Sequence, residues 1–306
     1  MIAMQHITLI GYGEVGQTFA HALQSQGLRV SAWDTKLQEP ATAAALQSIA
    51  HAHHIELGQS LADALRSSEL VISAVTASNA LQVALSAAAH IRSGVYFLDL
   101  NSASPGTKQQ ASQAIEAAGG RYVEAGVMTS VPPYGIRVPM LLGGSQAHGL
   151  QPILAAWGMD TQVVSSEVGV ASATKMCRSI MIKGLEALVI ESFSSARHYG
   201  VEDAMVATLQ ETFPGINWSE QAAYFFMRVA QHGKRRAEEM RESAATVAEA
   251  GFEPFMGAAI ADKQQFVADQ AAAGAFTSVP AKADWQTYAD ALLATRAPSH
   301  NTKTDQ

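Results

Sequence analysis

The stretch HITLIGYGEVGQTFAHALQSQG, residues 6–27, decides the fold of this protein. It opens with a short apolar run rich in β-forming residues, which is typical of a buried strand. Behind the glycines, apolar residues recur at helical spacing until Gly27, at Val15, Phe19, Ala22 and Leu23. The stretch therefore predicts a strand, a glycine-rich turn and a helix in direct succession.

Gly11, Gly13 and Gly16 form the pattern G-x-G-x-x-G at this turn. In such a turn the first glycine permits the tight bend, the second lets the backbone approach a pyrophosphate, and the third lets the helix pack on the strand. The helix N-terminus adds N–H groups and a partial positive charge for phosphates. Asp34 ends the next predicted strand, LRVSAWD (28–34), where a carboxylate can accept the ribose hydroxyls. The pattern predicts a dinucleotide site.

The choice between the two nicotinamide dinucleotides depends on two neighbouring residues. The carboxylate of Asp34 favours NAD, because it would repel the 2′-phosphate of NADP. Lys36 stands two residues further on and keeps NADP possible. The residues expected to contact the cofactor are Gly11, Gly13, Glu14, Val15, Gly16, Asp34, Val75, Thr76, Asn79 and Asn101.

Further strands and helices alternate up to about residue 165. Strands are predicted at 69–75, 94–100, 121–128 and 138–144, with helices at 60–67, 77–91 and 105–118. This alternation predicts a mainly parallel sheet covered on both faces, and almost everything afterwards reads as helix. We therefore predict an α/β Rossmann-type dinucleotide-binding domain followed by an all-α C-terminal domain. The predicted bounds are 1–165 for the first domain, 166–296 for a helical substrate and dimerisation domain with a long helix at about 169–198, and 297–306 for a flexible tail.

Composition narrows the class of protein. The chain has 306 residues, of which 48% are hydrophobic and 15% charged, as in ordinary globular proteins. A net charge of −7 argues against a nucleic-acid partner.

No apolar run is long enough to span a membrane, and MIAMQHITLIGYG (1–13) lacks the features of a signal peptide. Cys177 is the one cysteine, which excludes an internal disulfide and favours a cytoplasmic location. HAHHIELG (51–58) is accompanied by no cysteine or cluster of acidic residues at ligand spacing, so no metal site is predicted.

Two loops are expected at the carboxyl edge of the sheet, where ligands bind in such folds. The first is LDLNSASPGTK (98–108). Ser104 precedes Pro105 and suits a helix N-cap, so we assign Ser102 to the substrate site. The second is EAGVMTSVPPYG (124–135), which fits a rigid connector and a substrate-lining loop about equally well.

The long helix carries a narrow polar and cationic stripe. The stripe contains Ser172, Lys175, Ser179 and Lys183, with Arg178 and Glu186 beside it. The other faces of the helix are apolar, whereas a solvated face would be wider and would mix in more acids. At the N-terminal end of the helix, Gly169, Ala171 and Ala173 permit close approach to a neighbour, which is expected to be the nucleotide-binding domain.

Three motifs in order, GYGEVG (11–16), DLNSASP (99–105) and GVASATK (169–175), make the chain resemble the β-hydroxyacid dehydrogenase superfamily, which includes 6-phosphogluconate dehydrogenase. The C-terminal part is similar to a bacterial branch with a divergent helical domain. The resemblance implies that Lys175 is the catalytic lysine, that Ser102 contacts the substrate, and that two copies form a dimer through the helical domains. The chain departs from the family in the second loop, with Met128 and Thr129, and at Ser179 in place of an asparagine.

These residues predict an NAD(P)-dependent oxidoreductase. It would transfer hydride between nicotinamide and a small (3-)hydroxy acid, with Lys175 as general acid and base. Neighbouring cations in a partly dry cleft are expected to lower the pKa of Lys175, and Arg178 could clamp a carboxylate or phosphate. The expected substrate contacts are Ser102, Met128, Thr129, Arg178, Ser179 and Lys183. Reduction of an imine and NAD(H) sensing without turnover remain alternatives.

Overall fold

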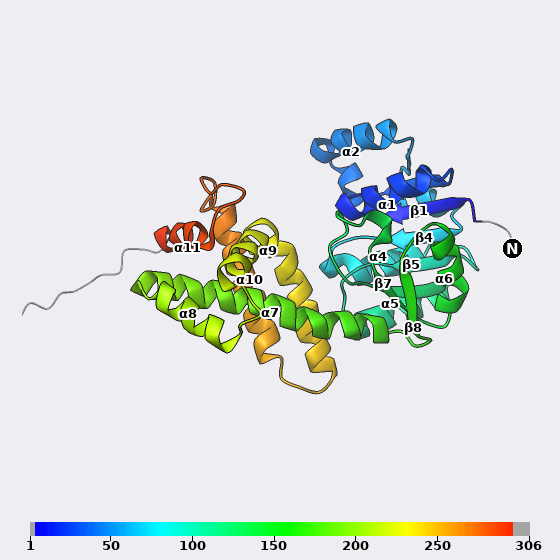
Figure 1. Ribbon diagram of the computed structural model, residues 1–306. Helices are drawn as coiled ribbons and strands as arrows, with labels where there is room; N and C mark the ends of the chain where they lie inside the picture. The colour runs from blue at the N-terminus through cyan, green and yellow to red at the C-terminus, as the bar shows by residue number, and fades with distance from the viewer. Residues whose placement is uncertain (1–3, 296–306) are drawn as a thin grey trace, which may run out of the picture. The chain divides into compact units, whose positions relative to one another are not determined.

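A computed structural model describes residues 4–295. The chain divides into two compact units (Figure 1). The first comprises Met1–Arg178 with Ala245–Glu253, and the second Ser179–Ala244 with Pro254–Gln306. The boundary predicted near residue 165 lies inside the first unit. The two units divide between Arg178 and Ser179, within the helix that begins at Val170. The predicted tail, 297–306, lies outside the described residues.

The first unit is built on an eight-stranded sheet in the order β3-β2-β1-β4-β5-β6-β7-β8. Its strands are β1 (His6–Ile10), β2 (Arg29–Trp33), β3 (Glu56–Leu57), β4 (Leu70–Ser73), β5 (Tyr96–Asp99), β6 (Arg121–Val127), β7 (Met140–Gly143) and β8 (Thr161–Ser165). Within the described sheet, neighbouring strands are parallel except for β6 and β7. The predicted mainly parallel sheet is confirmed.

Helices cover this sheet. They are α1 (Glu14–Gln24), η1 (Thr35–Gln38), α2 (Pro40–Ala52), α3 (Leu61–Leu65), η2 (Ala77–Asn79), α4 (Ala80–Ala88), α5 (Pro105–Ala117), η3 (Gly135–Arg137) and α6 (Ala147–Ala156). Sequence patterns did not predict α2, α6, β3 or β8. The two-residue β3 is too short for periodicity to register, and α6 contains Pro152, which normally argues against a helix interior.

The strand order places the ligand-binding edge. The chain runs outward from β1 through β2 to β3, then returns to add β4 on the other side of β1. Ligands in open parallel sheets bind at such a reversal, outside the carboxyl ends of the strands. The loops that follow β1 and β4 meet there. Because both faces of the sheet are covered, Ile7, Leu9 and Ile10 of β1 are all 0% exposed.

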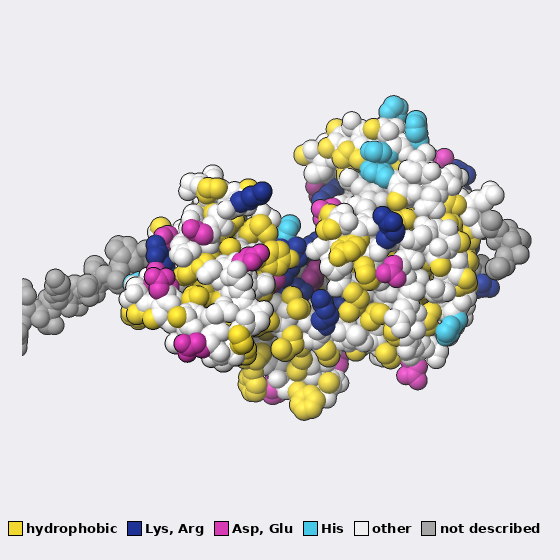
Figure 2. Space-filling view, viewed as in Figure 1, with side chains coloured by type: hydrophobic (Ala, Val, Ile, Leu, Met, Phe, Trp, Pro, Cys, Tyr) yellow, Lys and Arg dark blue, Asp and Glu magenta, His cyan; other side chains and the backbone are white. Residues whose placement is uncertain are grey.

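The second unit is helical, as predicted. It contains parts or all of α7 (Val170–Tyr199), α8 (Glu202–Thr212), α9 (Trp218–Glu249), α10 (Phe255–Ala272) and α11 (Trp285–Ala294). Phe193, Phe226 and Trp285 lie in its aromatic core. Hydrophobic side chains also lie on its surface (Figure 2), and Met181 and Leu188 of α7 are 67% and 56% exposed. Within residues 4–295, no helix is long and apolar enough to cross a membrane.

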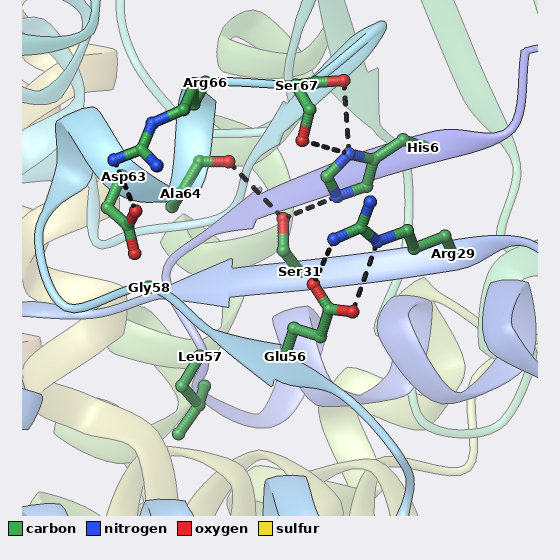
Figure 3. A pocket seen from close by; sticks show the side chains of 10 residues that line it. All are labelled: His6, Arg29, Ser31, Glu56, Leu57, Gly58, Asp63, Ala64, Arg66 and Ser67. Carbon is green, nitrogen blue, oxygen red and sulfur yellow. Dashed lines mark hydrogen bonds and ion pairs between the residues drawn. The ribbon is translucent and has the colours of Figure 1, made fainter.

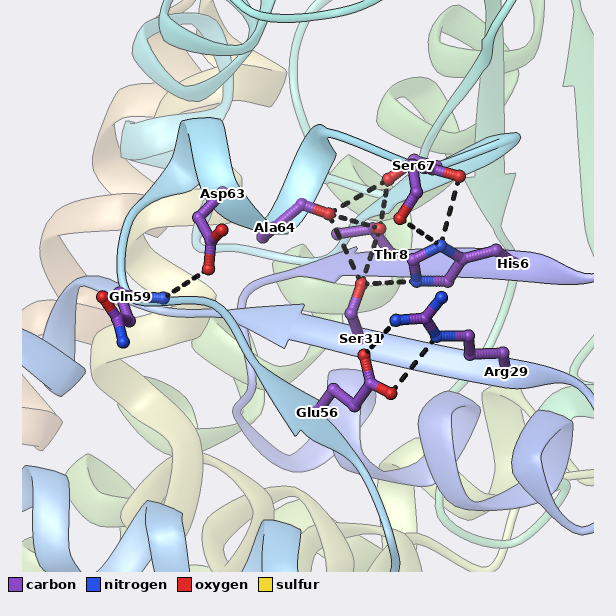
Figure 4. A network of polar contacts seen from close by, with 10 residues as sticks. His6, Thr8, Arg29, Ser31, Glu56, Gln59, Asp63, Ala64 and Ser67 are labelled. Carbon is purple, nitrogen blue, oxygen red and sulfur yellow. Dashed lines mark hydrogen bonds and ion pairs between the residues drawn. The ribbon is translucent and has the colours of Figure 1, made fainter.

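A polar network lies at one end of β1, around a cavity of about 160 Å³ beside β2 and α3 (Figure 3). The Nδ1 of His6 lies 3.1 Å from the carbonyl oxygen of Ser67, so Nδ1 carries the proton. The Nε2 lies 3.1 Å from the hydroxyl of Ser31, which also lies 2.8 Å from the hydroxyl of Thr8. Beside them Arg29 pairs with Glu56 at 2.7 Å (Figure 4). The imidazole of His6 is thus buried beside a cation, which lowers its pKa and favours its neutral form.

The folded protein is expected to lose stability as the pH falls below about 6.5, in part through His6. Burial, and secondly the charge of Arg29, lower the pKa of His6 below its ordinary value of 6.5. The unfolded chain then takes up a proton at a pH where the folded chain does not. Denaturant unfolding at pH 7 and pH 5 should show a smaller loss of unfolding free energy in His6→Gln than in the wild type. Equal losses in the two proteins would contradict this account.

Candidate functional site

The three glycines of the turn after β1 differ in what surrounds them. A Cβ on Gly16 would overlap the carbonyl oxygen of Gly11, and one on Gly11 would overlap that of Ala74. Gly11 also has a φ of 92°, which favours glycine. A Cβ on Gly13 would meet no atom within 4 Å. The first and third glycines are thus required by the packing of the protein, and the second leaves open space for a ligand.

Helix α1 begins beside that space. Its N-cap, Gly13, has no side chain to accept a hydrogen bond, and the N–H of Gln17 donates to the Gly13 carbonyl at 2.8 Å. The N–H groups of Glu14, Val15 and Gly16 therefore precede the first intrahelical bond. Together with the helix dipole they form the kind of site that binds a phosphate group.

Asp34 follows β2 at the same edge of the sheet. One carboxylate oxygen accepts the N–H of Tyr12 at 2.8 Å, and the other accepts the N–H of Lys36 at 2.9 Å. These two bonds hold the carboxylate next to the glycine turn. The side chain of Lys36 is exposed. The residues predicted to hold the adenosine end of a dinucleotide are therefore brought together by the fold.

Asn101 joins the loops that follow β4 and β5. It is 3% exposed, its side-chain oxygen accepts the N–H of Val75 at 2.7 Å, and its amide nitrogen donates to Ser73 at 2.9 Å. In the β4 loop, Asn79 donates to the hydroxyl of Thr76 at 2.9 Å. The side chain of Asn101 therefore fixes one predicted ligand-binding loop against the other.

A buried cluster under these loops has no clear signal in the sequence. Asp99 accepts hydrogen bonds from the N–H of Asn101 at 2.9 Å and the hydroxyl of Tyr122 at 2.7 Å, and it pairs with Lys108 at 2.9 Å. Both members of the ion pair are 1% exposed. Burial, and secondly the charge of Asp99, raise the pKa of Tyr122 well above its ordinary value. Lys108 stands in the first turns of α5, where a lysine is normally read as exposed.

The amine of Lys175, on α7, donates to the hydroxyl of Ser102 at 2.5 Å. These two residues are 73 positions apart in the chain. Ser104 accepts the N–H of Thr107 at 3.2 Å and is the N-cap of α5, as predicted. The fold therefore separates the two serines of this loop into a capping residue and a partner of the lysine.

Glu249 is a contact of this loop that the sequence did not reveal. One of its carboxylate oxygens accepts the hydroxyl of Ser104 at 2.6 Å, and the other accepts the N–H of Gly106 at 2.8 Å. Glu249 is the last residue of α9 and lies more than 140 positions away in the chain. It stabilises the first turn of α5 directly beside Ser102.

Arg178 reaches the loop after β6. Its guanidinium donates to the carbonyl oxygen of Met128 at 3.2 Å, and Met128 is held in turn by donating its own N–H to Pro139 at 3.0 Å. Thr129 is exposed beside it. Lys175 and Arg178 thus contact the loops that follow two neighbouring strands, β5 and β6.

The predicted polar stripe of α7 is mostly buried. Ser172, Ser179, Lys183 and Glu186 are between 1% and 7% exposed. Ser179 and Lys183 belong to the second unit, where Lys183 pairs with Glu239 at 2.9 Å. The substrate roles of Ser179 and Lys183 stay predictions.

Two family descriptions match the chain. Residues 6–169 match the NAD binding domain of 6-phosphogluconate dehydrogenase, and residues 196–267 match a domain of unknown function, DUF1932. A conserved hypothetical protein from Sinorhizobium meliloti 1021 is 36% identical, with coverage of 95% of this chain and 96% of that one and a TM-score of 0.75.

Two further solved structures are similar. A conserved protein whose description reports structural similarity with 3-hydroxyacid dehydrogenases is 31% identical, over 87% of this chain and 99% of that one, with a TM-score of 0.65. A Mycobacterium tuberculosis 3-hydroxyisobutyrate dehydrogenase is 17% identical over 94% of this chain and 99% of that one, with a TM-score of 0.66, a likeness in fold alone. The glycine turn, the strand order and these matches agree, and the chain belongs to the family that carries the NAD binding domain of 6-phosphogluconate dehydrogenase.

Proposed function

We propose that this protein is an NAD(P)-dependent oxidoreductase that interconverts a small 3-hydroxy acid and its oxo acid. The observation that carries the proposal is the hydrogen bond from the Lys175 amine to the Ser102 hydroxyl. Ser102 lies in the loop after β5, and β5 is the second strand from β1 in the sheet, on the side of β4. A proton donor therefore lies at the same edge of the sheet as the dinucleotide-binding turn.

The residues present fit a nicotinamide dinucleotide. The open space at Gly13 and the first-turn N–H groups of α1 would receive the pyrophosphate. Asp34 would accept the ribose hydroxyls, which supports NAD over NADP. The loop containing Val75 and Thr76 would line the crevice. The bound cofactor supplies or accepts the hydride.

The proton chemistry belongs to this chain. Oxidation of an alcohol requires a base at the hydroxyl group, and reduction of the carbonyl requires an acid at the same oxygen. Lys175 would hold that proton, while the hydroxyl of Ser102 orients the substrate by hydrogen bonding. A substrate oxygen placed near Ser102 would then lie within reach of the amine.

Arg178 is expected to bind the anionic group of the substrate. Its guanidinium has five N–H groups, and a carboxylate can accept two of them side by side. Arg178→Gln should raise KM about tenfold to a hundredfold, with a smaller change in kcat, because the interaction is present before and during hydride transfer. Steady-state kinetics would measure this. Arg137→Gln, at an exposed arginine of η3, is the matched control. An unchanged KM in Arg178→Gln would contradict the assignment.

A second copy of the chain is the partner that we propose for the helical unit. Met181, Ile182, Leu185 and Leu188 form an exposed apolar face on α7. Such faces mark interaction sites in soluble proteins. Light scattering on the purified protein should report a dimer, and Leu188→Glu should shift the mass toward the monomer.

The exposed thiol of Cys177 suits a reducing compartment, and we propose the cytoplasm.

The decisive experiment measures NADH and NADPH formation by the purified protein across a panel of 3-hydroxy acids, including phosphorylated and aryl-substituted members. Turnover would support the dehydrogenase and identify the preferred cofactor. Dinucleotide binding without turnover on this panel would exclude the simple hydroxy-acid proposal. Imines and their amine products would then be assayed, and silence there would leave NAD(H) sensing.

A further inference from the structure

Glu124, in the middle of β6, is a carboxylate with no exposed surface. Its Oε1 accepts the N–H of Gly169 at 2.7 Å and the N–H of Ala171 at 3.0 Å, at the start of α7. Its Oε2 has no hydrogen-bond partner among the residues that the structure describes. Burying a carboxylate is costly unless hydrogen bonds compensate it. The hydrogen bonds that offset the cost of burying the Glu124 carboxylate are therefore those from Gly169 and Ala171.

Those bonds fix the turn of α7 that leads to Lys175. The first N–H groups of a helix have no acceptor within the helix, and a negative charge is favourable there. Ala171 precedes Lys175 by four residues, which is about one turn of helix. By holding the first turn of α7, Glu124 therefore fixes the position of Lys175 along the helix axis and its direction around that axis.

Two glycines make this contact close. A Cβ on Gly126 of β6 would lie 2.9 Å from the carbonyl oxygen of Ala171 and 3.6 Å from the Cβ of Lys175. A Cβ on Gly143 of β7 would lie 2.5 Å from the Oε1 of Glu124. At Gly126 the backbone of β6 therefore lies directly against the backbone of α7. A change in the reach of Glu124 would therefore move α7 directly.

A second buried carboxylate holds the other member of the hydrogen-bonded pair. Asp99 of β5 is the register partner of Glu124 and accepts the N–H of Asn101, which precedes Ser102. Adjacent strands are about 4.8 Å apart. Two carboxylates on neighbouring strands thus hold the two backbone segments that carry Ser102 and Lys175.

We propose that Glu124 is a positioning residue for the reaction. It holds the amine of Lys175 at the distance from Ser102 at which a proton can pass to or from a substrate oxygen. Glu124 does not itself touch the substrate. The inference rests on the proposed function of Lys175.

The first test compares two replacements of Glu124. Glu124→Asp shortens the side chain by one methylene and withdraws the carboxylate from both N–H groups. A misplacement of about 1 Å can cost about 10² in rate, so kcat should fall about a hundredfold with little change in KM for the dinucleotide. Glu124→Gln keeps the length and one accepting oxygen, and should recover at least about a tenth of the wild-type kcat. Glu167→Asp, at an exposed glutamate between β8 and α7, should behave as the wild type.

The second test asks whether Glu124 acts through Lys175. In a Lys175→Ala background, adding Glu124→Asp should lower the residual rate less than about twofold, because the group that Glu124 positions is already gone. A full hundredfold loss in that background would overturn the proposal. If Glu124→Asp does not fold, as judged by circular dichroism, the comparison uses Glu124→Gln, whose smaller loss of at most about tenfold should likewise disappear in the Lys175→Ala background.

A third readout needs no substrate. Reductive methylation of the folded protein with formaldehyde and cyanoborohydride, followed by mass spectrometry across a pH series, reports the reactivity of the Lys175 amine. Glu124→Asp should shift that profile and Glu167→Asp should not. An unshifted profile with an unchanged kcat would overturn the positioning role. A shifted profile in a protein that turns over no hydroxy acid would instead leave Glu124 as the residue that positions Lys175 and exclude the proposed reaction.

Discussion

Lys175→Ala is expected to lower kcat by about 10² to 10⁴, the usual contribution of a positioned acid or base. The residue removed is the amine that donates to Ser102 at 2.5 Å. Alanine is compatible with a helix and opens no core cavity at a partly exposed position, so α7 should persist. NADH binding, measured by fluorescence titration, should change less than about twofold, because α1 and Asp34 are untouched.

The matched control is Cys177→Ser, an exposed residue two positions away on the same helix. It should retain wild-type kcat and unfolding temperature. The pH profile of Lys175→Ala should also lose the limb that belongs to the lysine. A Lys175→Ala protein with full activity would remove the general acid and base from the proposed mechanism and favour a binding protein or a different acid.

Gly13→Ala and Gly16→Ala are expected to fail in different ways. A Cβ on Gly13 meets nothing within 4 Å, and the φ of −80° suits any residue, so Gly13→Ala should fold and unfold as the wild type does. The same Cβ would occupy the space in which a pyrophosphate approaches the backbone. Dinucleotide affinity should therefore fall by about 10² or more, which corresponds to about 2.7 kcal/mol.

Gly16→Ala should destabilise the protein before any ligand is added. Its Cβ would overlap the carbonyl oxygen of Gly11, a backbone atom between β1 and α1 that cannot move without displacing the turn. We expect a loss of about 1–3 kcal/mol of unfolding free energy, as for overpacking elsewhere. Denaturant unfolding without ligand and NADH titration of each variant would separate the two effects. Equal loss of affinity without loss of stability in both variants would contradict the division of roles.

Local patterns were sufficient for the turn and for most of the sheet. The strand, the three glycines and α1 are contiguous, and a G-x-G-x-x-G turn has one dominant conformation, so residues 6–27 predict it without knowledge of the rest. Ser104 was recognised for the same reason, since an N-cap depends on the three residues that follow it. Asp34 follows β2, the next strand in the chain after α1, and lies 22 positions from Tyr12, whose N–H it accepts.

The surroundings of Lys175 could not be predicted in this way. Glu124, Lys108 and Glu249 each look like an ordinary charged residue in its own segment, and each acts across 9 to 145 positions of chain. A buried ion pair or hydrogen bond between distant segments leaves no periodic pattern in the sequence. It can be recognised once strands β5 and β6 are aligned and the helices are packed on them.

The sequence of α7 shows how far pattern can lead. Spacing predicted its narrow polar stripe, and the family resemblance singled out Lys175 within that stripe. The pattern indicated that the polar stripe is not a solvated face, and Lys183 and Glu186 are buried, but the pattern did not reveal that Met181 and Leu188 on the apolar side are exposed. Local periodicity determines that a helix has two kinds of face, because side chains repeat every 3.6 residues. Packing decides which face is covered, since burial depends on the ion pairs and hydrogen bonds that distant segments bring to it.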